Sequence, residues 1–333
     1  MSSRRADDAP NPIVAGVDLG GTKIQAIIVR GEDVLGTARV TTPVRSADAV
    51  AASIVESVLS ALDGSHVSAD RLAAVGIGSP GRVQDGVISN SPNVAGMWQP
   101  FPLGPTVSRG LGDLPVHIDN DVTVATLGEL ERGAGRPYAS FLSVFVGTGV
   151  GAGLVFDRTV WRGRSAAGEI GHMIVKPGGR RCGCGGRGHL ESYAGRASMQ
   201  AKAERLVAQG EHTVLFELME NHGRDRMTSG IIEHALKQGD AMTERLIDQA
   251  VWALGLALAS AQNLLDVEAV LIGGGLTERF GQPFVDRIAA QTRAGLFASD
   301  DPPAMVPAGL GDLSGAMGAA VLASAGRVHT PEA

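Results

Sequence analysis

The stretch of sequence that decides the fold is IVAGVDLGGTKIQAIIV, residues 13–29. An apolar run reaches a Gly-Gly pair and continues at once into a second β-branched run, which predicts a β-hairpin closed by a tight glycine turn. Residues 141–156, FLSVFVGTGVGAGLVF, repeat this pattern. Because glycine has no Cβ, backbone N–H groups in such turns can approach phosphate oxygens closely. The two hairpins therefore suggest two related halves with a cleft between them.

Neither hairpin fits a phosphate loop that opens a helix. A Walker loop needs Gly-x-x-x-x-Gly-Lys-Ser/Thr before a helix, and neither turn has it. Residues 147–152, GTGVGA, match the alanine variant of the dinucleotide fingerprint, but residues 153–156 continue as a strand. No acidic residue on a following strand completes that unit. A nucleotide, if bound, is therefore held by hairpin turns.

Helical patterns alternate with the strands. Residues 47–62 form one such pattern and precede a strand within residues 71–81. Residues 243–266 carry apolar side chains at helical spacing, which predicts a long core helix. This helix leads into a third glycine turn, AVLIGGGLT, at residues 269–277. The alternation indicates an α/β protein.

The composition is that of a globular protein. The 333 residues are enough for two domains, and 44% of them are apolar and 19% charged. The net charge of −6 comes without a basic run, so nucleic-acid binding has no electrostatic basis. No uncharged apolar stretch is long enough to span a membrane. Residues 1–12, MSSRRADDAPNP, lack the apolar run of a signal peptide and are expected to be the disordered leader of a cytoplasmic protein.

Both cysteines of the chain lie in GEIGHMIVKPGGRRCGCGGRGHLES, residues 168–192. A disulfide between Cys182 and Cys184 would be strained, so the two thiols are expected either to bind a metal or to be inert. His172 stands ten positions before this pair and His189 five positions after it. The stretch is therefore a candidate metal loop.

Six motifs follow one another along the chain: VDLGGTK, GIGSPGRV, NDVTVATLGE, VGTGVGAG, GEIGH and CGCGGRGHLE. Together they resemble the ROK family (repressors, open reading frames and sugar kinases) over roughly residues 13–325. The resemblance implies a two-domain actin-like (ribonuclease H-like) ATPase fold with an interdomain cleft. Repressors of the family carry a helix-turn-helix domain before the DLGGT hairpin. Since the hairpin begins at residue 13, we expect the kinase branch.

The resemblance also implies the domain limits. The small α/β domain is expected to comprise residues 13–118 and 309–333. The large α/β domain, with the metal loop, is expected at residues 119–308.

Asp121, in HIDNDVTVATLGE, is the candidate catalytic base. It stands between a strand and a helix-forming run, which places a carboxylate at a strand end beside a helix N-terminus. The resemblance supports Asp121 as the acceptor of a sugar hydroxyl proton and Asn120 as a sugar ligand. Local sequence leaves two alternatives open. Asp121 can be a helix N-cap, and Asp119 is a rival base.

The resemblance assigns the remaining site residues to nucleotide and sugar. Asp18 is expected near the Mg²⁺ of ATP, through water. The expected nucleotide ligands are Asp18, Gly20, Gly21, Thr22, Lys23, Gly147, Thr148, Gly149, Gly273, Gly274 and Gly275. The expected sugar ligands are Ser79, Gly81, Asn93, Asn120, Asp121, Glu169, His172 and Glu191. Taken singly, each glycine turn can be a plain tight turn, Lys23 a solvated lysine, and Ser79 a ligand through its backbone alone.

The set His172, Cys182, Cys184 and position 189 resembles the zinc site of the family, in which the last ligand is ordinarily a third cysteine. This chain has His189 there, and histidine is a normal zinc ligand. Four protein ligands leave no open position, so the zinc is expected to be structural. It would orient His172 and Glu191 towards the sugar, because little else is expected to hold a glycine-rich loop. Alternatively, His189 is an exposed loop residue and the site is degraded or labile.

The resemblance implies an ATP-dependent hexose kinase, with glucose phosphorylated at its C6 hydroxyl as the first expectation. N-Acetylglucosamine, N-acetylmannosamine, mannose or fructose are alternative acceptors, and polyphosphate is an alternative donor. From other classes, a catalytically inactive sugar sensor or a zinc-binding interaction module remains open. The family also suggests a homodimer or homotetramer.

Overall fold

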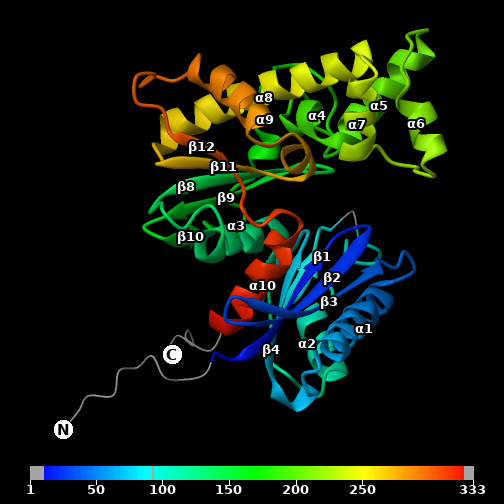
Figure 1. Cartoon of the computed structure of the whole chain (residues 1–333), viewed down its shortest axis with the longest axis vertical. Coiled ribbons are helices and arrows are strands. Elements are labelled where there is room, and N and C mark those ends of the chain that lie inside the picture. The colour runs from blue at the N-terminus through cyan, green and yellow to red at the C-terminus, as the bar shows by residue number, and fades with distance from the viewer. Residues whose placement is uncertain (1–10, 92–93, 326–333) are drawn as a thin grey trace. The chain divides into compact units, whose positions relative to one another are not determined.

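A computed structural model describes residues 11–91 and 94–325 (Figure 1). Most of the predicted leader and the candidate ligand Asn93 lie outside the described residues. The chain forms two compact units. Unit 1 comprises the residues up to Arg132 together with those from Leu313 onward, and unit 2 is Gly133–Asp312. Strands and helices alternate in both units, so the predicted α/β class is confirmed.

Unit 1 contains a mixed five-stranded sheet with the order β3-β2-β1-β4-β7. The strands are β1 (Ile13–Leu19), β2 (Lys23–Arg30), β3 (Asp33–Thr41), β4 (Leu72–Ser79) and β7 (Val116–Asn120). The predicted hairpin is present as the antiparallel pair β1–β2. Strand β4 runs parallel to both β1 and β7, so three carboxyl ends lie at one edge of the sheet. A short ribbon of β5 (Arg82–Gln84) and β6 (Val87–Ser89) follows β4.

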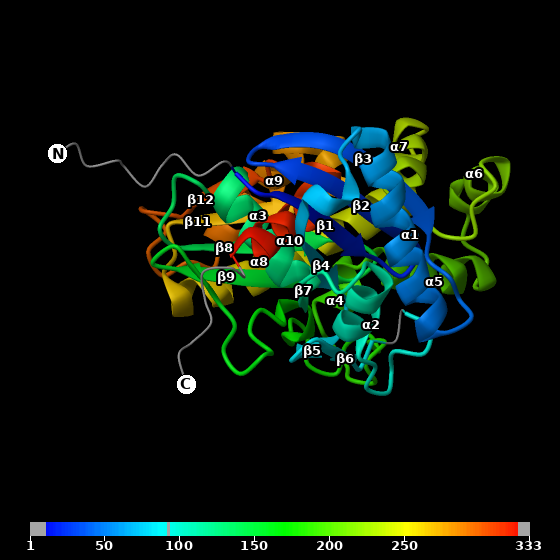
Figure 2. The ribbon, with the colours of Figure 1, turned by 90° about the horizontal axis from the view of Figure 1, so that it is seen from below.

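Helix α1 (Ala47–Ser65) covers one face of this sheet, beside β2 and β3 (Figures 1 and 2). It begins where the Ser46 side chain accepts a hydrogen bond of 3.2 Å from the Ala49 N–H, and it ends at His66 in the left-handed conformation. The helix predicted at residues 47–62 is thus confirmed. Helix α2 (Leu103–Gly110) packs beside α1, and η1 (Ala69–Arg71) leads into β4.

Helices α3 (Asp121–Arg132) and α10 (Ser314–Ala325) cover the opposite face. Glycines bring the backbones together here, since a Cβ at Gly76 would lie 1.8 Å from the Ala319 oxygen. A Cβ at Gly318 would lie 1.8 Å from the Val124 oxygen, so α10 also packs closely on α3. The division between the units therefore follows Arg132, whereas the sequence placed it after residue 118. The prediction ended the small domain too early because the packing of α3 on α10 leaves no local signal.

Unit 2 repeats the topology of unit 1. Its sheet has the order β10-β9-β8-β11-β12, and the strands are β8 (Phe141–Val146), β9 (Val150–Phe156), β10 (Thr159–Trp161), β11 (Ala269–Gly273) and β12 (Ala304–Pro307). Strands β8, β9 and β10 pair antiparallel, while β11 runs parallel to β8 and β12. The second predicted hairpin is β8–β9. The matching strand orders bear out the expectation of two related halves.

Helices pack on this second sheet through one apolar cluster that includes Leu142, Leu254 and Ile288. Helix α8 (Ala241–Leu265) is the predicted core helix, and it begins where the Asp240 carboxylate accepts a 2.7 Å bond from the Thr243 N–H. Helix α9 (Gly275–Arg293) packs along it. The remaining elements are η2 (Ile170–His172), α4 (Glu191–Ala194), α5 (Arg196–Ala208), α6 (Leu215–Asn221), α7 (Ser229–Lys237) and η3 (Gly311–Leu313). Among the described residues, no helix combines the length and apolar character that a membrane span requires.

Candidate active site and metal centre

Acidic side chains gather where the central parallel strands of unit 1 end. Asp18 of β1 pairs in register with Gly78 of β4, and Gly78 pairs in turn with Asp119 of β7. Residues paired in this way point to the same face, so the two carboxylates flank a glycine, with their backbones about 10 Å apart. A Cβ at Gly78 would lie 3.4 Å from the Cα of Asp121, the next acidic residue. This edge therefore carries three carboxylates within a short distance.

Asp121 is the first residue of α3, directly after the end of β7. The placement predicted from its flanking sequence is thus confirmed. The N-cap role belongs to its neighbour, since Asn120 Oδ1 accepts bonds of 3.1 Å from the Val122 N–H and 3.2 Å from the Thr123 N–H. Asp121 Oδ1 accepts a 2.9 Å bond from the Val122 N–H, and Asp119 Oδ1 accepts a 2.8 Å bond from the Asn120 N–H. The N-cap alternative for Asp121 is therefore wrong.

Asn120 also connects the end of β7 to the turn that follows β4. Its Nδ2 donates a 3.3 Å bond to the Gly81 oxygen, so both ends of the amide bind the chain itself. Gly81 has a φ of 97°, and a Cβ there would lie 2.7 Å from the Ser89 oxygen. The Ser79 side chain is fully buried and donates to the Pro80 oxygen at 3.2 Å. A contact of Ser79 with a sugar would therefore use its backbone, as the sequence left open.

The β1–β2 turn has a support that the sequence analysis missed. Thr42 Oγ1 donates a 2.7 Å bond to the Gly20 oxygen, and the Thr42 N–H donates a 3.0 Å bond to the Thr22 oxygen. Thr42 is buried, and a threonine after a strand carries no signal of such a role. Lys23 opens β2. Asp18 lies against the first turn of α10, where a Cβ at Gly315 would come within 2.7 Å of the carboxyl carbon.

The β8–β9 turn of unit 2 is held by the start of α5. The Gly147 N–H donates a 2.9 Å bond to the Gly149 oxygen, which closes the turn. The Arg196 N–H donates a 3.2 Å bond to the Gly147 oxygen, and the Ala197 N–H donates a 3.1 Å bond to the Thr148 oxygen. Sequence reasoning did not identify these supports, because they lie almost fifty residues away in the chain.

The third glycine turn opens a helix. Strand β11 ends at Gly273, and Gly274, with a φ of 92°, precedes the first residue of α9. A Cβ at Gly274 would lie 2.3 Å from the Val146 oxygen, so this turn is closely packed on the end of β8. In the part of the chain that the structure describes, no side chain caps α9, and Gly281, with a φ of 60°, interrupts the helix after its first turns.

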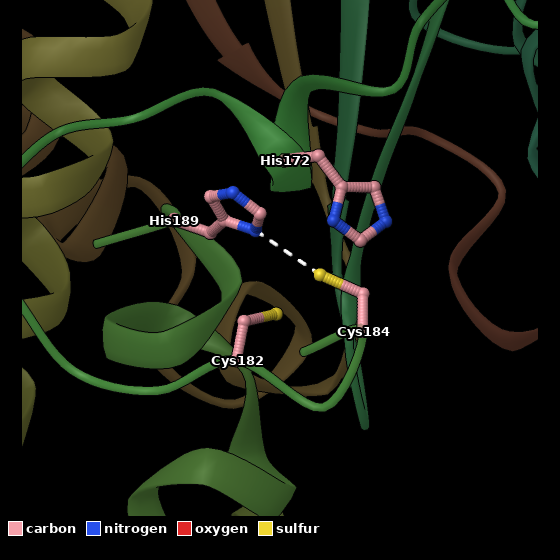
Figure 3. Close-up of side chains that lie close together, drawn as sticks. All are labelled: His172, Cys182, Cys184 and His189. Atoms are coloured by element: carbon pink, nitrogen blue, oxygen red, sulfur yellow. Dashed lines mark hydrogen bonds between the residues drawn. The ribbon is translucent and has the colours of Figure 1, made fainter. Parts of the chain in front are cut away.

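Figure 3 shows the four predicted metal ligands pointing towards one another. Their ligand atoms all lie within 4.8 Å of one another, and Cys184 Sγ is 3.3 Å from His189 Nδ1. A tetrahedral zinc site with bonds near 2.0–2.3 Å needs ligand atoms about 3.3–3.8 Å apart. Small side-chain rotations would reach that geometry. The His₂Cys₂ set therefore fits a zinc ion, with His189 in the position of a ligand.

The metal loop holds its thiols in unlike surroundings. Cys182 is buried and Cys184 is exposed. Burial raises the pKa of the Cys182 thiol; a backbone hydrogen bond from Cys184 opposes this rise, while the Cys184 thiol and the Glu191 carboxylate add to it. A zinc ion held here would offset the increase, because zinc binds the thiolate.

Glu191 links the metal loop to the β8–β9 turn. Its Oε2 accepts a 3.0 Å bond from the Val150 N–H, and its Oε1 lies 3.8 Å from the Cys182 sulfur. A Cβ at Gly149 would lie 2.3 Å from Oε2, so this approach requires glycine. The first residue of α4 thus touches both elements.

The other two predicted sugar ligands of unit 2 lie beside Glu191. Glu169 Oε2 is 3.7 Å from His172 Nε2. A Cβ at Gly171 would lie 2.2 Å from the Val150 oxygen and 3.6 Å from Glu191 Cβ, so η2 packs directly on β9 and α4. The structure therefore places Glu169 and His172 side by side, with η2 packed next to Glu191.

The loop also has supports that need no metal. The Arg180 N–H donates a 3.1 Å bond to the Tyr193 hydroxyl, and the guanidinium lies 4.6 Å from the Tyr193 ring centroid. Arg180 also donates to Gln249 of α8, and Trp252 of α8 packs edge-on against Tyr193. The expectation that little else would hold the loop is therefore wrong, because these side chains fix one side of it to α8.

The comparisons with known proteins agree over nearly the whole chain. The family model described as ROK family matches residues 14–325. The glucokinase of Streptomyces coelicolor is 33% identical over 319 residues, covering 93% of this chain and 97% of that protein. A ROK family glucokinase from Streptomyces griseus, solved with glucose and AMPPNP, is 34% identical with a TM-score of 0.80, covering 93% and 99% of the two chains. A ROK hexokinase from Thermus thermophilus is 32% identical with a TM-score of 0.74, covering 93% and 97%.

Proposed function

Because the chain belongs to the ROK family, we infer that it is an ATP-dependent glucokinase, which transfers the γ-phosphoryl group of ATP to the C6 hydroxyl of glucose. Its fold is the actin-like ATPase fold of the ROK hexokinases. The observation that carries the reaction is the position of Asp121 at the first residue of α3, beside the strand ends that carry Asp18 and Asp119.

Asp121 is proposed to align the sugar hydroxyl and accept its proton. Phosphoryl transfer requires an acceptor held in line with the phosphate, and a carboxylate within hydrogen-bond reach of the hydroxyl supplies one. The bonds from Asn120 to the first turn of α3 and to Gly81 fix the helix start that carries this carboxylate. Asn120 thus has a positioning role in addition to the proposed sugar contact. Asp119 is the rival base; its Oδ1 accepts a backbone bond just as Asp121 Oδ1 does, so the family resemblance of the Asn120–Asp121 pair is what favours Asp121.

The glycine turns are proposed to hold the nucleotide. The turns at Gly20–Thr22 and Gly147–Gly149 would bind phosphates, and Gly273–Gly275 would lie against the adenosine. Asp18 is proposed to hold the Mg²⁺ of ATP through water, and this cation offsets the phosphate charge during transfer. The side-chain bond from Thr42 and the backbone bonds from α5 keep two of these turns in one conformation.

Glu169, His172 and Glu191 are proposed to bind the sugar hydroxyls, together with residues of the Ser79–Gly81 turn and with Asn93. Their closeness at η2 and α4 supports this assignment. A zinc ion held by His172, Cys182, Cys184 and His189 is proposed to be structural. It would fix which His172 ring nitrogen faces the sugar, and it would hold the loop beside Glu191.

The acceptor sugar, the phosphoryl donor and the oligomeric state are also proposed. N-Acetylglucosamine, N-acetylmannosamine, mannose or fructose as acceptor, and polyphosphate as donor, are the alternatives within the kinase class. A cytoplasmic homodimer or homotetramer is the proposed state in the cell. A sugar sensor without catalysis is the alternative from another class.

A coupled assay of nucleotide consumption across hexoses and N-acetylhexosamines tests the proposal, first with ATP and then with polyphosphate. We expect a strong preference for glucose with ATP. A preference for another sugar would move the assignment within the kinases. Sugar binding without phosphorylation of any sugar would contradict the kinase function and favour the sensor.

A further inference from the structure

Arg196 joins two of the glycine turns of unit 2. It is the first residue of α5, and its backbone N–H donates a 3.2 Å bond to the Gly147 oxygen in the β8–β9 turn. Its side chain extends to the start of α9, where a Cβ at Gly275 would lie 3.4 Å from the guanidinium NH1. The side chain of Arg196 therefore lies beside the turn proposed to bind the nucleotide.

The NH1 group of Arg196 is buried and has no hydrogen-bond partner among the described residues. Buried donors are almost always paired in folded proteins, so this group needs explanation. Burial lowers the pKa of Arg196, whereas the negative charges of Glu278 and Asp312 raise it and offset part of this decrease. A guanidinium prefers planar, bidentate partners such as phosphate oxygens. The unpaired NH1 is thus suited to an anion that arrives with a substrate.

A second buried donor lies at the same turn. Thr277, in the first turn of α9, is 4% exposed, and its hydroxyl has no partner among the described residues. The arginine and the threonine thus offer two buried donors at one turn, beside the charges of Glu278 and Asp312.

We propose that Arg196 binds the nucleotide phosphate that is attached to the ribose, at the turn Gly273–Gly275. This inference rests on the proposed kinase function and deepens it, because Arg196 was not among the ligands expected from the sequence. The adenosine would lie against the glycine turn, which places the first phosphate nearest the start of α9. The proposal explains why α5 begins with an arginine whose backbone binds one glycine turn and whose buried NH1 group lies beside another.

The test compares R196M and R196K with wild type in the full-length protein. R205M is the matched control, since Arg205 is exposed on the same helix. Calorimetric titrations with adenosine, AMP and ADP, in the presence of glucose, give the contribution of each phosphate. We expect R196M to weaken AMP and ADP binding at least tenfold, while adenosine and glucose binding stay within twofold. R196K should fall between R196M and wild type, because it keeps the charge and loses the planar fork.

Two results would overturn the inference. An equal loss for adenosine and AMP means that the arginine acts on the fold of the turn, and an unchanged AMP affinity means that it contacts no phosphate. If R196M does not fold, the same comparison with R196K decides. If the wild-type protein binds no nucleotide, the proposed function is refuted as well. If the wild-type protein binds nucleotide normally and R196M gives one of the two results above, only the role of Arg196 is refuted.

Discussion

The contact between Glu191 and Gly149 provides a sharp test of how the sugar ligands are held. In Gly149→Ala the new Cβ would lie 2.3 Å from Glu191 Oε2, well inside van der Waals contact. The carboxylate is the end of a flexible side chain, so it moves and the backbone stays. The 3.0 Å bond from the Val150 N–H to Oε2 is then lost. Glu191 no longer has a fixed position beside Cys182.

The expected magnitude follows from that single bond. A hydrogen bond to a charged group contributes about 1.5–3 kcal/mol. Glu191 is only partly buried, so the lower end of this range applies. A loss of about 1.4 kcal/mol corresponds to a factor of ten, and the glucose Kd should therefore rise about tenfold.

The assay is a glucose titration without nucleotide for G149A, E191A and the double variant. Gly147→Ala is the matched control, since the nearest atom to its Cβ would be 3.9 Å away. The double variant should bind glucose no more weakly than E191A, because both changes remove the same interaction. Fully additive losses, or a G149A variant with wild-type glucose affinity, would refute the reasoning.

Three further predictions concern the supports of the site. Thr42→Val should raise the KM for ATP and lower the free energy of unfolding by about 1 kcal/mol, because it removes the bond to the Gly20 oxygen. Kinetics and urea titrations measure the two effects, and the control Thr41→Val, at an exposed position, should change neither. Asn120→Ala should have a free energy of unfolding about 1 kcal/mol lower than that of Asn120→Asp in urea titrations, because aspartate keeps the cap of α3. Equal stabilities of the two variants would contradict the capping role. Cys184→Ser should lose both zinc, measured by atomic absorption, and glucose affinity, and the control Arg187→Ala should retain both. Glucose affinity that survived the loss of zinc would contradict the proposal that zinc holds the sugar ligands in place.

The features that the sequence predicted well are those with a local signature. Both hairpins follow from apolar runs that meet at glycine pairs, and helices α1 and α8 follow from their apolar spacing. The metal loop was found because its four ligands fall within eighteen residues, His172 to His189. Such patterns depend on neighbours in the chain, which a single sequence displays.

The features that it missed depend on contacts between distant residues. Helix α3 belongs to unit 1 because Gly318 of α10 admits its backbone, and these elements are almost two hundred residues apart. The bond from Asn120 to Gly81 and the buried NH1 group of Arg196 depend on where Gly81 and Gly275 lie in space. No residue type or spacing in the sequence indicates such a partner, so the contact can be identified only in the folded chain.

The central claim is that Asp121 is the base of an ATP-dependent glucose kinase. The most direct test is the kcat for glucose phosphorylation with ATP in wild type, Asp121→Asn and the rival variant Asp119→Asn. General base catalysis typically contributes about 10²–10⁴-fold, so Asp121→Asn should lower kcat by at least about a hundredfold, with the melting temperature and glucose Kd almost unchanged. Asp119→Asn should retain most of the activity. A wild-type enzyme that phosphorylates glucose while Asp121→Asn keeps a near-normal kcat would contradict the account.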